Sequence, residues 1–202
     1  MTKIIEKVID KLSFLPGIGR KRAIKITMQL LKWEKKEIKE FSRAIEDLQK
    51  IVRCKICFNI SEEEICNICQ DKTRERKKIC VVEEPSNITT IEKTHTYNGL
   101  YHVLGGVISP IDGIDPDDLQ IKELMERIKT KKIEEVIIAT NPTTEGELTA
   151  EYISDLLKEY DVKITRIARG MPAGTDIDLA DEITIGLSIK GREIIKEVKK
   201  VT

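Results

Sequence analysis

Four cysteines have the residue type and spacing of a metal site. Cys54 and Cys57 form one CxxC pair, Cys66 and Cys69 form a second, and eight residues separate the two pairs. Each CxxC turn can offer two sulfurs to one ion, so two matched pairs can surround Zn²⁺ tetrahedrally. Four sulfur ligands leave no open coordination position, and we therefore predict one structural zinc ion per chain. A redox pair or buried apolar cysteines are the alternatives, and two matched pairs favour zinc over both.

A glycine turn followed by basic residues is the second candidate site. Glycines at 17 and 19 lack a Cβ and let the backbone approach a phosphate, while the N–H groups that begin the next helix point at it. Lys21 and Lys25 are four residues apart and project from one helical face. Neither contact reads a base, so binding should be independent of sequence and sensitive to salt. The candidate DNA-binding residues are Gly17, Gly19, Arg20, Lys21, Arg22 and Lys25. The alternative is an ordinary helix–helix turn with a solvated basic face.

The charge distribution supports a nucleic-acid partner at the N-terminal end. The formal net charge is zero, but residues 1–50 carry 13 Lys and Arg against 7 Asp and Glu. A basic first part joined to an acidic remainder favours binding of nucleic acid by the first part, with a chance imbalance as the alternative. No apolar run reaches the roughly 18–20 residues that span a bilayer, and charged residues interrupt the first seven positions. We expect a cytoplasmic protein without a membrane partner.

Helical and strand patterns indicate how these sites are positioned. Apolar residues at helical spacing predict helices over 5–12, 23–30 and 41–52. From residue 79 onward, strands at 79–82, 101–104, 136–139 and 162–167 alternate with helices at 86–93, 119–128 and 148–157. This alternation predicts a parallel α/β sheet. Cys80 lies in the first of these strands and is expected in the core rather than on the metal.

A few other polar and aromatic residues have two interpretations each. His102, in a predicted strand, is expected to be packed or hydrogen-bonded rather than a metal ligand. Trp33 could stack on a base or pack against a neighbouring side chain. The acidic run Asp112, Asp115, Asp117 and Asp118 lacks the spacing of a calcium loop and is expected to supply turns and helix caps.

Two segments resemble the motifs of a Toprim domain, the module shared by topoisomerases and primases. Residues 81–85 resemble its first strand motif and residues 139–147 its second. In catalytic Toprim domains the second motif carries two aspartates that hold Mg²⁺, but here Asn141 and Thr143 occupy those positions. Mg²⁺ bound to phosphate substrates requires carboxylate ligands, so Glu83 and Glu145 alone make a poor site. We predict that the chain is not an enzyme; a Toprim-type nuclease or topoisomerase-like enzyme is the alternative.

The order of the motifs resembles bacterial recombination mediators of the RecR family over essentially the whole chain. Residues 101–106, 109–113 and 166–172 add to the resemblance. It implies an α/β multidomain protein: a helix-hairpin-helix domain over 1–53, a four-cysteine zinc finger over 54–69, a Toprim domain with a parallel sheet over 78–173, and a C-terminal helical segment over 174–202.

The same resemblance implies a role in DNA repair. Family members assist loading of RecA onto gapped single-stranded DNA together with RecO, and in some settings RecF. They bind single- and double-stranded DNA as ring-like homo-oligomers, so a tetramer or a dimer is expected. Lys21 and Lys25 would contact DNA, and Glu83, Glu145 and Glu147 would form a partner-binding surface. A structural zinc protein that binds only a protein partner is a third hypothesis.

Overall fold

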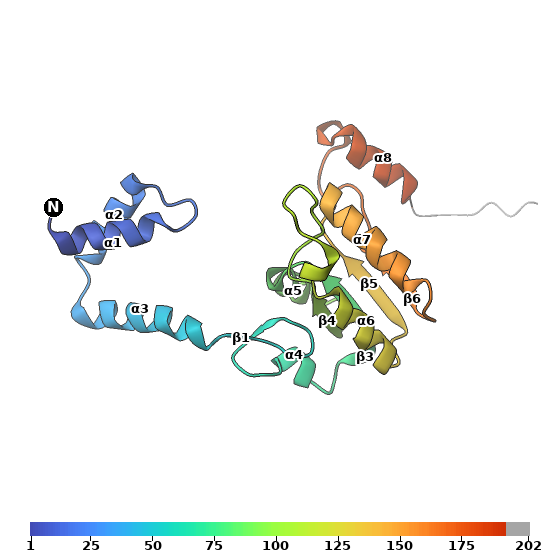
Figure 1. The fold of residues 1–202 in the computed structure, drawn as a ribbon. Coiled ribbons are helices and arrows are strands. Elements are labelled where there is room, and N and C mark those ends of the chain that lie inside the picture. The colour runs from blue at the N-terminus through green and yellow to red at the C-terminus, as the bar shows by residue number, and fades with distance from the viewer. Residues whose placement is uncertain (193–202) are drawn as a thin grey trace, which may run out of the picture. The chain divides into compact units, whose positions relative to one another are not determined.

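The computed structural model describes residues 1–192 and divides them into two compact units, the first over Met1–Ile51 and the second from Val52 onward. Helices α1 to α3 belong to the first unit, and the sheet, the cysteines and the remaining helices belong to the second (Figure 1). Among the helices of the described chain, none is both long and apolar enough to cross a membrane.

Two short helices form the core of the first unit. Helix α1 spans Lys3–Ser13 and α2 spans Arg20–Leu30. Ile9 of α1 and Ala23 and Thr27 of α2 are buried where the two helices pack. Gly17 has a φ of +76°, a left-handed conformation that glycine adopts without steric cost, and this reverses the chain between the helices. The expected helix-hairpin-helix element is confirmed.

A third helix, α3, spans Lys35–Asp47 and is followed by the 3₁₀ turn η1, Leu48–Lys50. The helix predicted over 41–52 therefore starts earlier and ends earlier. Val52 instead lies in a strand, β1 (Val52–Arg53), because it pairs with Ser61 of β2 (Ile60–Ser61). Trp33, for which two interpretations were open, packs edge-to-face against Phe41 with ring centroids 5.7 Å apart.

The second unit is built on a four-stranded parallel sheet with the order β4-β3-β5-β6. The strands are β3 (Glu75–Val82), β4 (Gly99–Val103), β5 (Glu135–Ala139) and β6 (Lys163–Arg166). Helices α5 (Pro85–Glu92), α6 (Ile121–Thr130) and α7 (Thr144–Leu157) connect them. The predicted parallel sheet is confirmed, which places the loops after β3 and β5 at the same edge.

Several boundaries differ from expectation, and the two largest differences in the second unit have local reasons. Strand β3 begins at Glu75, four residues before the predicted start. The prediction missed its first half because these residues are charged and largely solvent-exposed and therefore carry no apolar signal. Helix α7 begins at Thr144 rather than at 148. The hydroxyl of Thr143 accepts a hydrogen bond from the Gly146 N–H at 3.1 Å, which caps the helix at that point.

The two faces of the sheet have separate apolar cores. On one face, Ile79 and Val81 of β3 pack with side chains of α6 and α7 such as Leu124 and Ile153. On the other face, Cys80 belongs to a cluster that includes Ile88 of α5 and the four cysteines of the CxxC pairs. Cys80 is thus a core residue, as predicted, and burial raises the pKa of its thiol to about 12. The zinc module and the sheet share one buried cluster.

The acidic run near residue 115 and His102 have the structural roles that were expected of them. Asp115 precedes the 3₁₀ turn η2 (Pro116–Asp118), and its N–H donates to Asp118 at 2.8 Å, so these acids serve turns and caps as expected. His102 is fully buried and its Nε2 donates to the Gln120 carbonyl at 2.7 Å. Burial lowers its pKa to about 4, so the ring is neutral at pH 7.

The C-terminal segment is only partly within the described residues. It contains the 3₁₀ turn η3 (Ile177–Leu179) and helix α8 (Glu182–Lys190). The helix agrees with the expected helical segment over 174–202, and residues 193–202 lie outside the described part of the chain.

Candidate metal centre and nucleic-acid interface

The four cysteines of the CxxC pairs converge on one point. Their sulfurs all lie within 4.8 Å of one another, and all four residues are buried. A tetrahedral zinc ion with Zn–S bonds of about 2.3 Å needs sulfurs roughly 3.8 Å apart, so a small inward adjustment completes the site. In the described residues no other group of three or more His, Cys, Asp or Glu gathers in this way.

Local backbone structure prepares these sulfurs for a metal. The N–H groups of Ile56 and Cys66 point at the Cys54 sulfur, at 3.5 and 3.3 Å, and stabilise a thiolate there. Phe58, directly after the first pair, has a φ of +63°, which turns the chain sharply around the site. Since zinc binds thiolates, this residue set fits a structural zinc ion.

Hydrogen bonds also fasten the zinc module to the sheet. The Cys57 carbonyl accepts a hydrogen bond from the Val103 N–H at 2.8 Å, on the outer edge of β4. The guanidinium of Arg76 donates to the Cys69 carbonyl at 3.1 Å. Both contacts join a CxxC turn to a strand of the sheet, so zinc binding should stabilise the sheet as well as its own loop.

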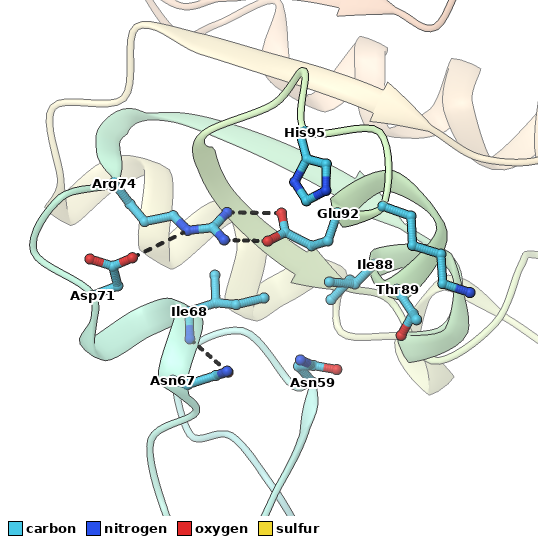
Figure 2. Close-up of a pocket in the computed structure, with 10 residues that line it drawn as sticks. Asn59, Asn67, Ile68, Asp71, Arg74, Ile88, Thr89, Glu92 and His95 are labelled. Atoms are coloured by element: carbon cyan, nitrogen blue, oxygen red, sulfur yellow. Dashed lines mark hydrogen bonds and ion pairs between the residues drawn. The ribbon is translucent and has the colours of Figure 1, made fainter.

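A cavity of about 730 Å³ lies between the zinc module and α5 (Figure 2). On its wall, the side chain of Arg74 forms a two-pronged ion pair with Glu92 of α5. The Tyr101 hydroxyl also donates to Glu92, at 2.6 Å. The Arg74 guanidinium holds the pKa of Glu92 below its usual range. This ion pair connects the residue that precedes β3 to helix α5. It could not be predicted from sequence spacing, because its two partners are 18 residues apart.

The basic turn of the first unit has the features expected of a phosphate site. Gly19 is the N-cap of α2 and offers no side chain to the first N–H groups, and the first turn holds no acidic residue. Both features leave the positive end of the helix dipole open to an anion. Lys21 and Lys25 are exposed, and in the described chain neither takes part in an ion pair.

The two arginines of this turn are placed differently. Arg20 pairs with Asp10 of α1 at 2.9 Å, with both side chains about 60% exposed. Because exposed ion pairs contribute only about 0–1 kcal/mol, a phosphate can compete for Arg20. Arg22 turns back towards the Gly17 carbonyl at 3.4 Å. The structure therefore leaves Lys21 and Lys25 as the least engaged cations of the candidate interface.

At the Toprim-like edge of the sheet, Glu83 follows β3 and Asn141 follows β5. The Asn141 N–H donates to Glu83 Oε1 at 2.6 Å, and its side-chain amide donates to Oε2 at 2.5 Å. One asparagine thus occupies both oxygens of a carboxylate that is only 8% exposed. A Cβ on Gly146 would come within 2.1 Å of the Asn141 carbonyl, so glycine is required for this close approach. An aspartate at 141 would repel Glu83; the amide instead donates to it.

The other two acids of this edge are separated from Glu83. One oxygen of Glu147 accepts a hydrogen bond from Arg166 at 2.7 Å and forms an ion pair with Arg169 at 2.9 Å. Glu145 is half-buried in the first turn of α7. The three glutamates named from the sequence do not gather as a metal-binding group in the described residues. The roles of Arg166 and Arg169 could not be predicted from the sequence, because the Toprim motifs are defined by their carboxylates.

The fold and the metal centre define a zinc protein that combines a helix-hairpin-helix element with a Toprim-type sheet. Family models match four consecutive segments: the RecR helix-hairpin-helix over residues 5–48, the RecR four-cysteine zinc finger domain over 51–71, the Toprim domain over 77–168 and the RecR C-terminal segment over 170–193. The chain belongs to the RecR family.

Similarity to curated relatives extends over nearly the full length. The recombination protein RecR of Clavibacter michiganensis subsp. michiganensis is 47% identical over 195 residues, which cover 96% of this chain and 98% of the relative. That of Chloroherpeton thalassium is 48% identical over 195 residues, covering 93% and 95%. That of Streptomyces coelicolor is 44% identical over 193 residues, covering 95% and 97%. The expected family and the zinc cofactor are thereby confirmed.

Proposed function

We propose that this chain is a recombination mediator in DNA repair, which binds DNA and acts without catalysis. Membership of the RecR family supports recombination and repair. The observation that carries the DNA-binding part is the open N-terminus of α2, with exposed Lys21 and Lys25 on one helical face and no acidic residue in its first turn. Such a site binds backbone phosphates whatever the base sequence, in single- or double-stranded DNA.

The proposed activity is the loading of RecA onto gapped single-stranded DNA coated by single-strand-binding protein, with RecO and in some settings RecF as partners. Glu83, Glu145 and Glu147 are the acids of the proposed partner surface: Asn141 bonds Glu83, and Arg166 and Arg169 pair with Glu147, whereas Glu145 is half-buried in the first turn of α7. RecA filament assembly on coated DNA should accelerate only when RecO and this chain are both present. Acceleration by RecO alone, to the same rate, would contradict the proposed activity.

The proposal that the chain is not a nuclease or topoisomerase rests on the edge after β3 and β5. Glu83 is bonded through both oxygens to Asn141, and Glu147 is held by two arginines, so no pair of free carboxylates is left for Mg²⁺ among these residues. We expect supercoiled plasmid to be neither nicked nor relaxed in the presence of Mg²⁺ or Mn²⁺. Cleavage that copurifies with the protein and disappears in Glu83→Ala would support the enzyme instead.

We further propose a homo-oligomer, a ring-like tetramer or a dimer, that surrounds DNA. Helix α3 has no buried residue, although Ile38, Phe41 and Ile45 follow one face and Leu48 of η1 comes directly after it. Soluble monomers seldom leave an apolar stripe of this kind exposed, so the stripe indicates a surface that a partner subunit covers.

Ile45, which is 53% exposed, offers a test of this assembly. Ile45→Asp should shift the solution mass towards that of a smaller species, because it places a charge in the middle of the stripe. Arg43→Asp, on the polar side of the same helix, is the matched control and should leave the mass unchanged. Light scattering that reports only monomer for the unaltered chain, at high protein concentration, would contradict the oligomer.

A further inference from the structure

A buried arginine lies beside the zinc module without an anionic partner. Arg127 of α6 is only 6% exposed. Its Nη1 donates to the Tyr101 carbonyl at 2.5 Å, but Nε and Nη2 have no hydrogen-bond partner within the described residues. A guanidinium stays charged in proteins, and a buried charge is costly unless a negative group offsets it. The surroundings of Arg127 must therefore supply a negative charge.

The outer edge of β4 brings Arg127 and the zinc module together. Strand β4 ends the sheet, so its outer backbone groups have no neighbouring strand. Arg127 bonds the carbonyl of Tyr101, and Cys57 bonds the N–H of Val103, two residues further along the same edge. Two residues of a strand span roughly 7 Å. Arg127 also lines a cavity of about 290 Å³ together with Lys55, Ile56 and Phe58 of the first CxxC turn.

The charge of the metal centre complements this cation. Zn²⁺ with four thiolates has a net charge of about −2. Burial lowers the pKa of Arg127, and the negative charges of Cys69, Cys57 and Cys54 act in the opposite direction. The neighbouring Lys55 pairs at the surface with Glu64, at 2.7 Å, and is not buried.

We propose that Arg127 is the counter-charge of the zinc centre. It offsets part of the negative charge of the four thiolates and joins the metal to α6, so that zinc binding and the packing of α6 on the edge of β4 stabilise each other. Arg127 acts as a positioning residue, since it does not itself ligate the metal. A buried water bridging Arg127 to the unpartnered Nδ1 of His102 is the competing explanation for its free donors.

Zinc affinity of full-length variants distinguishes the two explanations. Arg127→Met removes the charge at similar length, and we expect it to weaken zinc binding about tenfold or more in competition with a chromophoric chelator. Arg127→Lys keeps the charge and should retain most of the affinity. Arg74→Met is the matched control: it removes another poorly exposed arginine, whose partner is Glu92, and should lower the melting temperature without changing zinc affinity.

Two results would overturn the proposal. One is unchanged zinc affinity in Arg127→Met, which is the result expected if the donors serve only a water. The other is equal loss of affinity in Arg127→Lys and Arg127→Met, which would mean that charge is not what matters. If Arg127→Met is insoluble, Arg127→Gln replaces it, because an amide can still donate to the Tyr101 carbonyl but has no charge. Weaker zinc binding in that variant supports the counter-charge, and unchanged binding contradicts it.

Discussion

Cys54→Ser is expected to yield protein that holds no stoichiometric zinc and is largely unfolded or insoluble. Structural zinc contributes roughly 10–16 kcal/mol of apparent free energy in small modules, whereas a whole domain is stable by only about 5–15 kcal/mol. The effect should extend beyond the zinc loop, because the four cysteines share a buried cluster with Cys80 and Val82 of β3. Elemental analysis of the unaltered chain should give about one zinc ion per chain.

Cys80→Ser is the control for this experiment. Its thiol is equally buried, but it lies outside the group of four sulfurs. Burying a hydroxyl without a partner costs about 1–3 kcal/mol, so the variant should melt at a lower temperature and keep its zinc. A zinc-free preparation of the unaltered chain with an unchanged melting temperature would show that the metal is not structural.

Lys21→Ala is expected to weaken DNA binding strongly and by the same factor for every sequence. Lys21 is exposed, and its N–H belongs to the open first turn of α2. Removing one phosphate interaction should reduce the slope of log affinity against log salt by about one for duplex DNA. In an oligomer the effect is multiplied, because every subunit contributes the same interaction. Zinc content and melting temperature should stay unchanged, since the side chain packs against nothing that the fold needs.

Sequence patterns predicted the structural features that depend on residues close together in the chain. The CxxC spacing identified the metal ligands because each turn is a local structure, and the alternation of strands and helices after residue 79 predicted the parallel sheet. The end of α3 was predicted wrongly. Its apolar period continues to Val52, but pairing with Ser61 draws that residue into a strand.

Contacts between segments far apart in the sequence could not be predicted from such patterns. Asn141 was recognised as a missing magnesium ligand, but not as the residue that bonds both oxygens of Glu83, 58 positions away. Arg127 belongs to no motif and has the sequence context of a surface residue on an amphipathic helix. Its burial depends on the edge of β4, which only the folded sheet defines.

The most direct test of the proposed DNA-binding role is the affinity for one fixed DNA, single- and double-stranded, measured across a range of salt concentrations. The unaltered chain, Lys21→Ala and Lys132→Ala are compared, since Lys132 is an exposed lysine of the second unit and matches the charge removed. We expect Lys21→Ala to bind more weakly and with a salt slope lower by about one for each phosphate interaction removed, while Lys132→Ala binds like the unaltered chain. Equal weakening in the two variants would contradict the assignment, because the glycine turn would then be no more than a solvated basic surface.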